Sequence, residues 1–161
     1  MIFVTVGHYL PFNRMTKAID KWAALRDCTD IFAQIGPTMW HPRHIRWANF
    51  LKPEEFDKKM KEATVVVAHA GTGTIFETLE LGKPILVMPR LVQFHEATTD
   101  HQLYMAKRFQ DSGLIDMAID ENDLISRLDH VYELHSHTPI SASASSQLLN
   151  TVHDFVNLYD S

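Results

Sequence analysis

Short apolar runs alternate with amphipathic segments along this chain, a pattern that indicates strands and helices following one another. The apolar runs predict strands over Ile2–Val6, Ile31–Ile35, Ile45–Leu51, Val65–Ala68, Pro84–Met88 and Ile115–Ala118. Apolar residues at helical spacing predict helices over Phe12–Arg26, Pro53–Glu62, Thr99–Asp111, Asn122–His135 and from the glycine turn at 71–73 to Leu81. This alternation is typical of an α/β fold with a doubly wound parallel sheet, which binds ligands at the carboxyl ends of its strands.

We expect one such domain over residues 1–135, since this length can bury a core of its own. A Ser-rich connection without apolar periodicity occupies residues 136–146, and we expect it to be mobile. Apolar residues at helical spacing then predict an amphipathic helix over residues 147–161. They are Leu148, Leu149, Val152, Phe155, Val156 and Tyr159.

Composition excludes several classes of function. The formal net charge of -5 gives no basic patch for nucleic acid. The single cysteine, Cys28, suits a reducing cytosol, and no apolar run approaches the roughly 20 residues of a membrane span. The ten histidines do not follow the spacing of a metal motif, so we expect scattered surface histidines and no metal site.

The stretch that follows the strand Val65–Ala68 carries the strongest chemical signal. Gly71 and Gly73 begin a helix there, so the backbone can approach a ligand closely, and the free N–H groups favour an anion such as a diphosphate. Glu77 lies one turn further on, on the same helix face as Gly73, where its carboxylate can accept hydrogen bonds from ribose hydroxyls. Together these features indicate a nucleotide site.

Two simpler interpretations stay open on these residues alone. First, a strand, a glycine turn and a helix follow one another in every α/β fold. Second, a glutamate in the first turn of a helix, such as Glu77, is often no more than a favourable partner of the helix dipole. The turn is not the dinucleotide fingerprint, because Phe76 stands where the third glycine belongs.

Three stretches resemble the C-terminal, donor-binding domain of glycosyltransferase family 28. They are MIFVTVG, VVVAHAGTGTIFETLELGKPILVMPR and FHEATTDHQ. The resemblance runs from Met1 to about Leu114. It is strongest to small stand-alone members of the family, which act in the dolichol pathway and in bacterial exopolysaccharide and capsule assembly. It implies a Rossmann-like fold, the C-terminal type of lobe of a GT-B glycosyltransferase.

The resemblance also assigns roles within a donor site. Gly71, Thr72 and Gly73 would face the diphosphate, and Glu77 would hold the ribose hydroxyls. Asp100 and Gln102 would contact hydroxyls of the donor hexose. The alternative is that Asp100 only caps the helix that follows and that Gln102 is a first-turn residue.

Further donor contacts are expected in the neighbouring loops. Arg90 and His95 would neutralise the leaving diphosphate, unless Arg90 is a solvated loop residue. His69 would donate to a phosphate or orient the loop. Gly7 opens a loop that is shorter than its family counterpart and lacks the family's threonine, and backbone groups near Phe50–Pro53 would read the uracil.

The implied function is that of a UDP-sugar-dependent hexosyltransferase subunit acting on a polyprenyl-diphosphate-linked acceptor. The acceptor lobe and the catalytic base would come from a membrane-anchored partner, so this chain would be cytoplasmic and peripheral to the membrane. We expect no metal and no further cofactor. We also expect the purified chain to self-associate or to gain activity with its partner. The alternative is a non-catalytic, regulatory nucleotide-sugar-binding module. A UDP-sugar 2-epimerase would need its second lobe in the same chain.

Overall fold

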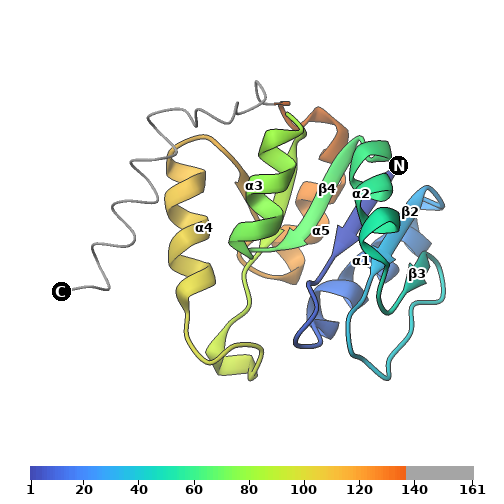
Figure 1. The fold of residues 1–161 in the computed structure, drawn as a ribbon. Coiled ribbons are helices and arrows are strands. Elements are labelled where there is room, and N and C mark those ends of the chain that lie inside the picture. The colour runs from blue at the N-terminus through green and yellow to red at the C-terminus, as the bar shows by residue number, and fades with distance from the viewer. Residues whose placement is uncertain (137–161) are drawn as a thin grey trace.

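A sheet of six parallel strands forms the centre of residues 1–136, the part of the chain that the computed structural model describes (Figure 1). The strands are β1 (Ile2–Thr5), β2 (Ile31–Gln34), β3 (Arg46–Ala48), β4 (Val65–His69), β5 (Ile85–Met88) and β6 (Asp116–Met117). Their order is β3-β2-β1-β4-β5-β6, with Ile2 of β1 opposite Ile31 on one side and Val65 on the other. The chain order reverses at β1, which confirms the doubly wound parallel sheet.

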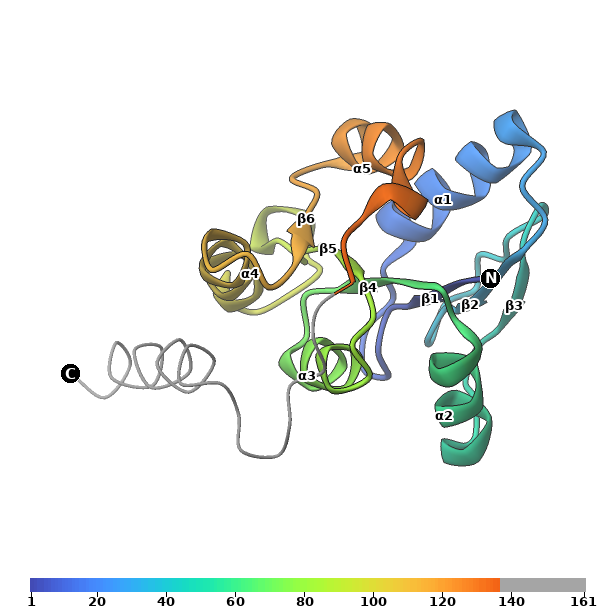
Figure 2. The same cartoon turned by 90° about the horizontal axis from the view of Figure 1, so that it is seen from above.

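Helices cover both faces of the sheet (Figure 2). They are α1 (Asn13–Arg26), α2 (Pro53–Glu62), α3 (Thr72–Glu80), α4 (His101–Asp111) and α5 (Glu121–Leu128). Side chains of β1 alternate between two cores, because successive residues of a strand point to opposite faces. Ile2 and Val4 pack with α1 and α5, whereas Phe3 packs with α2, α3 and α4.

Two predicted elements differ from the structure. The helix predicted over Asn122–His135 is wrong in length, since α5 ends at Leu128 and a separate 3-10 turn, η2 (Val131–Glu133), follows. The carboxylate of Asp129 accepts hydrogen bonds from Trp22 Nε1 and from Arg26 at this break, which fastens the end of α5 to α1. The strand predicted over Ile45–Leu51 is shorter in the structure, where β3 ends at Ala48. Beyond it, Leu51 N donates to the side-chain oxygen of Gln34 and not to a backbone carbonyl of a neighbouring strand.

Other parts of the prediction are refined or fall outside the description. The loop predicted over Pro89–Thr98 contains a 3-10 turn, η1 (Val92–Phe94). Most of the Ser-rich connection and the whole C-terminal helix lie outside the described residues. Within residues 1–136, no helix has the length and apolarity needed to cross a bilayer.

The contact between Asp129 and α1 gives a pH-dependent stability. Hydrogen bonds from Arg26 and Trp22 lower the pKa of Asp129 to about 2. A carboxyl group whose pKa is depressed by folding stabilises the fold above its unfolded pKa, and this contribution is lost as the pH falls through its folded pKa. We therefore expect Asp129→Asn to lower the melting temperature at neutral pH and to flatten its decrease between about pH 4 and pH 2.

Thermal denaturation followed by circular dichroism across this pH range measures both effects. Asp111→Asn is the matched control, because Asp111 is exposed and has no ion-pair partner among the described residues. Parallel stability profiles of the Asp129→Asn variant and the unsubstituted chain would contradict the expectation.

Candidate functional site

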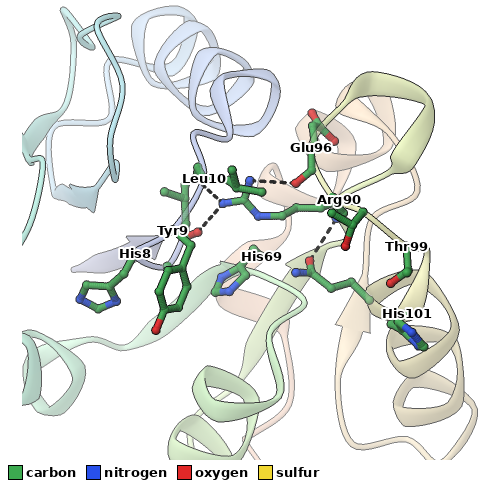
Figure 3. Close-up of a pocket in the computed structure, with 13 residues that line it drawn as sticks. His8, Tyr9, Leu10, His69, Arg90, Glu96, Thr99 and His101 are labelled. Carbon is green, nitrogen blue, oxygen red and sulfur yellow. Dashed lines mark hydrogen bonds between the residues drawn. The ribbon is translucent and has the colours of Figure 1, made fainter. Parts of the chain in front are cut away.

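A cleft of about 290 Å³ opens at the carboxyl ends of β1, β4 and β5, where the strand order reverses (Figure 3). Its walls come from the β1–α1 loop, the end of β4, the β5–α4 loop and the start of α4. The lining residues are Val6, Gly7, His8, Tyr9, Leu10, His69, Arg90, Glu96, Ala97, Thr98, Thr99, His101 and Gln102. Four of the predicted donor-binding residues are among them: Gly7, His69, Arg90 and Gln102.

The guanidinium of Arg90 bridges the two sides of this cleft. Arg90 is only 4% exposed. Its Nη2 donates to the carbonyl oxygens of Val6 at 2.7 Å and of Leu10 at 2.6 Å. Nη1 donates to the carbonyl oxygen of Pro11 at 2.7 Å. Figure 3 shows the side chain reaching from the β5–α4 loop to the loop that carries Tyr9 and Leu10. Arg90 is therefore not a solvated loop residue, and its donors hold backbone carbonyls.

A second arginine fastens the β5–α4 loop from the other side. Arg14 of α1 donates to both carboxylate oxygens of Glu96, each at 2.9 Å, and also to Glu121 at 3.1 Å. Paired N–H groups of a guanidinium match the two oxygens of a carboxylate, so this contact also fixes orientation. Leu91 N donates to the same carboxylate. The loop between η1 and α4 is thus held by side chains that the sequence analysis did not single out.

His69, the last residue of β4, has its ring between two glycines. A Cβ atom built on Gly71 would lie 2.3 Å from His69 Nε2, and one built on Gly7 would lie 2.9 Å from the same atom. Both glycines are therefore needed to accommodate the imidazole. Gly7 also has a positive φ of 78°, which side chains rarely tolerate.

Burial keeps this imidazole uncharged. The desolvation of the ring, helped by the positive charge of Arg90, lowers the pKa of His69 to about 4. Nδ1 has no hydrogen-bond partner among the described residues. At neutral pH the ring is thus uncharged, with one N–H donor and one acceptor nitrogen.

The start of α3 lies directly beyond His69. Gly71 is the N-cap, and Thr72 and Gly73 follow as exposed residues of the first turn. Ile75 N donates to Gly71 O, whereas the N–H groups of residues 72–74 have no partner among the described residues. A Cβ atom on Gly73 would meet nothing within 4 Å. These N–H groups and the positive end of the helix dipole favour an anion at this position.

Glu77 lies one turn along α3, half-buried. Desolvation raises the pKa of its carboxyl group, and the negative charges of Asp57 and Glu80 add to the effect. No cation or hydrogen-bond donor contacts this carboxylate among the described residues. The side chain is an acceptor without a donor, four residues from Gly73 on the same helix.

The remaining predicted residues lie around the β5–α4 loop. Gln102 Oε1 accepts from Arg90 N at 3.2 Å, and Asp100 Oδ1 accepts from Val92 N at 3.0 Å. Asp100 does occupy the N-cap position of α4, but its side chain makes no capping hydrogen bond. His95 is exposed, has a positive φ of 56° and does not line the cleft.

Several lining residues were not predicted. Glu96 was missed because its partner Arg14 is 82 residues away in sequence, and no local pattern marks such a pair. Tyr9 carries a signal that could have been used, since it lies in the loop that Gly7 opens after the first buried strand. Within residues 1–136, no group of three or more His, Cys, Asp or Glu side chains could hold a metal ion.

Comparisons with known proteins agree with this geometry. The family model of the glycosyltransferase family 28 C-terminal domain matches residues 1–158. The UDP-N-acetylglucosamine--N-acetylmuramyl-(pentapeptide) pyrophosphoryl-undecaprenol N-acetylglucosamine transferase of Clostridium tetani is 28% identical over 112 residues. That alignment covers 66% of this chain and 30% of the relative. The UDP-N-acetylglucosamine transferase subunit ALG13 of Candida glabrata is 37% identical over 70 residues, 41% of this chain and 33% of the relative.

Among solved structures, the NMR solution structure of ALG13 has a TM-score of 0.61 at 19% identity. The match covers 87% of this chain and 89% of that one, and at this identity it shows the shared fold. The chain spans about a third of the length of the two sequence relatives.

The position of the His69 ring predicts opposite effects for two neighbouring glycines. Gly71→Ala places a methyl group against a buried imidazole that Gly7 confines on its other side, so we expect a loss of about 1–3 kcal/mol in the free energy of unfolding. Gly73→Ala meets open space, so the free energy of unfolding should stay unchanged or rise by up to about 1 kcal/mol. Urea denaturation measures both values. Equal stability of the two variants would show that the His69 ring does not occupy the space beside Gly71 in which the methyl group would stand.

Proposed function

The chain belongs to the family of the glycosyltransferase family 28 C-terminal domain, and we propose that it is the donor-binding subunit of a UDP-sugar-dependent hexosyltransferase. Both sequence relatives are named as transferases of N-acetylglucosamine, which supports a UDP-activated hexose as the donor. The acceptor is a sugar or glycan linked to a polyprenyl diphosphate. The hexose itself is not assigned.

One observation carries the proposal: α3 presents unpaired donors and an unpaired acceptor one turn apart. The N–H groups of Thr72 and Gly73 suit the diphosphate of a nucleotide, and the Glu77 carboxylate suits the two hydroxyls of its ribose. A diphosphate joined to a ribose supplies both missing partners at this spacing. Gly73 leaves open space where a side chain would stand in the way.

The cleft beside α3 is the proposed site of the hexose. Gln102 and the neutral ring of His69 line it, and both can hydrogen-bond with hydroxyl or phosphate oxygens. Asp100 keeps a second carboxylate oxygen beyond the one that accepts from Val92 N. The acceptor hydroxyl would displace UDP directly, and the α3 N-terminus would stabilise the negative charge that develops on the diphosphate.

Arg90 contributes to this site in a different way from the role expected from the sequence. Its donors hold the carbonyls of Val6, Leu10 and Pro11, so it shapes the cleft and adds a positive charge only at a distance. Charge compensation for the leaving diphosphate then depends mainly on backbone N–H groups. His95 would have to turn inward to contribute.

The catalytic base and the acceptor site are proposed to come from a separate, membrane-anchored subunit. The Candida glabrata relative is named as a subunit, which supports this form of the proposal. The exposed aromatic side chain of Tyr9 lines the cleft and suits a covering lobe. Alone, the chain should bind UDP weakly and transfer little sugar.

Glu77 provides the sharpest test of the donor site. Its pKa is raised in the folded state, and a raised carboxyl pKa means that ionisation of Glu77 destabilises the fold at neutral pH. Glu77→Gln should therefore leave the free protein equally stable or more stable, while UDP binding weakens by about 1–3 kcal/mol because the ribose loses a charged acceptor. Calorimetric titration with UDP and urea denaturation measure the two quantities.

Glu80→Gln is the matched control, since Glu80 lies on the same helix but is exposed. It should leave UDP affinity unchanged. Unchanged affinity in the Glu77→Gln variant would remove the ribose role. UDP-sugar binding without any sugar transfer by the reconstituted pair of subunits would favour the non-catalytic module.

Donor binding should not depend on a divalent metal. No metal-holding group of side chains exists within residues 1–136, and the α3 N–H groups already face the position proposed for the diphosphate. We expect the same UDP affinity, within about twofold, in EDTA and in Mg²⁺ or Mn²⁺. Calorimetry under the three conditions measures it, and a loss in EDTA that added metal restores would overturn this part of the proposal.

A further inference from the structure

Positive charge is concentrated on one surface of an otherwise acidic chain. No Asp or Glu occurs between Asp30 and Glu54, although the formal net charge of the chain is -5. The loop between β2 and β3 lies in this stretch and carries Arg43. The neighbouring helix α1 adds Lys17 and Lys21, which are exposed and four residues apart on one helix face.

The cations of this surface are not neutralised by nearby carboxylates. Asp20 is the acidic residue that faces the loop, and it is buried. Its carboxylate accepts from the backbone N–H groups of Arg43 and His44 and contacts the His44 ring at 3.2 Å. Within residues 1–136, neither the guanidinium of Arg43 nor the amine of Lys21 has an ion-pair or hydrogen-bond partner.

An exposed apolar side chain lies in the same loop as Arg43. Met39, in the β2–β3 loop, is 94% exposed, and the adjacent Trp40 ring lies 5.7 Å from Lys17 Nζ. The loop around it is held in place. Thr38 Oγ1 donates to Asn13 Oδ1 at 2.7 Å, and the His41 ring stacks on Trp47 at 4.3 Å. The fixed loop therefore keeps the Met39 side chain in water.

We propose that this surface, formed by Lys17, Lys21, Met39, Trp40 and Arg43, docks on an anionic lipid bilayer. The cations would face lipid headgroups, and the thioether of Met39 would enter the interfacial region, with Trp40 at headgroup level. A bilayer is favoured over a nucleic acid because the phosphate backbone of a nucleic acid offers no apolar region for the Met39 side chain to enter.

The docking surface adjoins the proposed donor site. The β2–β3 loop leaves the same edge of the sheet as the β1–α1 loop (Figure 1), and Gly36 approaches the carbonyl oxygen of Leu10. Contact with a bilayer through Met39 would therefore bring the edge that contains the cleft towards the membrane. The inference goes beyond the proposed function and stands without it, because it needs neither a nucleotide nor a partner subunit.

Sedimentation with vesicles tests the inference on the full chain alone. We expect binding to vesicles of phosphatidylcholine and phosphatidylglycerol in equal parts, weakened by added salt, and little binding to phosphatidylcholine alone. Lys21→Glu combined with Arg43→Glu should weaken partitioning by about tenfold or more. Lys61→Glu combined with Lys107→Glu changes the net charge equally at exposed positions on α2 and α4 and should have a much smaller effect.

Two substitutions of Met39 separate insertion from charge attraction alone. Met39→Ser should weaken binding to the anionic vesicles without altering the melting temperature. Met39→Trp should give a fluorescence signal that brominated lipids quench. Equal losses in the two double variants, equal binding to both kinds of vesicle, or no quenching of the Met39→Trp signal would overturn the proposal, as would binding of acidic protein or nucleic acid without binding of vesicles.

Discussion

The site depends most on one buried contact, that between the Arg90 guanidinium and the carbonyl oxygens of the β1–α1 loop. Arg90 follows β5, whereas its acceptors Val6 and Leu10 follow β1, more than 75 residues earlier. If the cation were removed, these carbonyls would lose their partners where water has little access, and each such loss costs about 1–3 kcal/mol. The contact thereby sets the width of the cleft and the position of Gly7 against His69. The ion pair between Arg14 of α1 and Glu96 holds the β5–α4 loop, in which Arg90 also lies.

The electrostatics of the site follow from burial more than from formal charges. His69 loses its charge because its ring is enclosed, and Glu77 keeps an acceptor without a donor because α3 turns it towards other acidic groups. The N–H groups at the start of α3 then supply the positive potential next to the cleft. Such an arrangement suits a ligand that is anionic at one end and rich in hydroxyls at the other. This division between the two ends of a ligand supports a nucleotide sugar.

Local pattern predicted most elements well because the central strands β1, β4 and β5 are buried on both faces and each amphipathic helix covers one face. The valines of β4 and the spacing of Met15, Ile19 and Trp22 in α1, with Phe12 as its N-cap residue, illustrate this. The end of α5 was not predictable, since it depends on Asp129 meeting Trp22 across the fold. The role of Arg90 was not predictable either. An arginine in a ligand loop indicates a phosphate contact, but the partners of Arg90 are backbone carbonyl oxygens. The glycine turn was recognised from the sequence. The confinement of His69 between Gly7 and Gly71 was not predictable, because these glycines belong to two loops that are far apart in the sequence and meet only in the folded structure.

The central position of β1 has a consequence for the synthesis of the chain. This strand is synthesised before the other five strands of the sheet, yet one of its two neighbours, β4, begins more than sixty residues after Ile2. The nascent chain can therefore pair β1 with β2 early, but one edge of an apolar strand stays open until β4 emerges. The Arg90 contact can form only after β5 has followed. Translation thus builds the half of the sheet that holds the β2–β3 loop before the cleft exists.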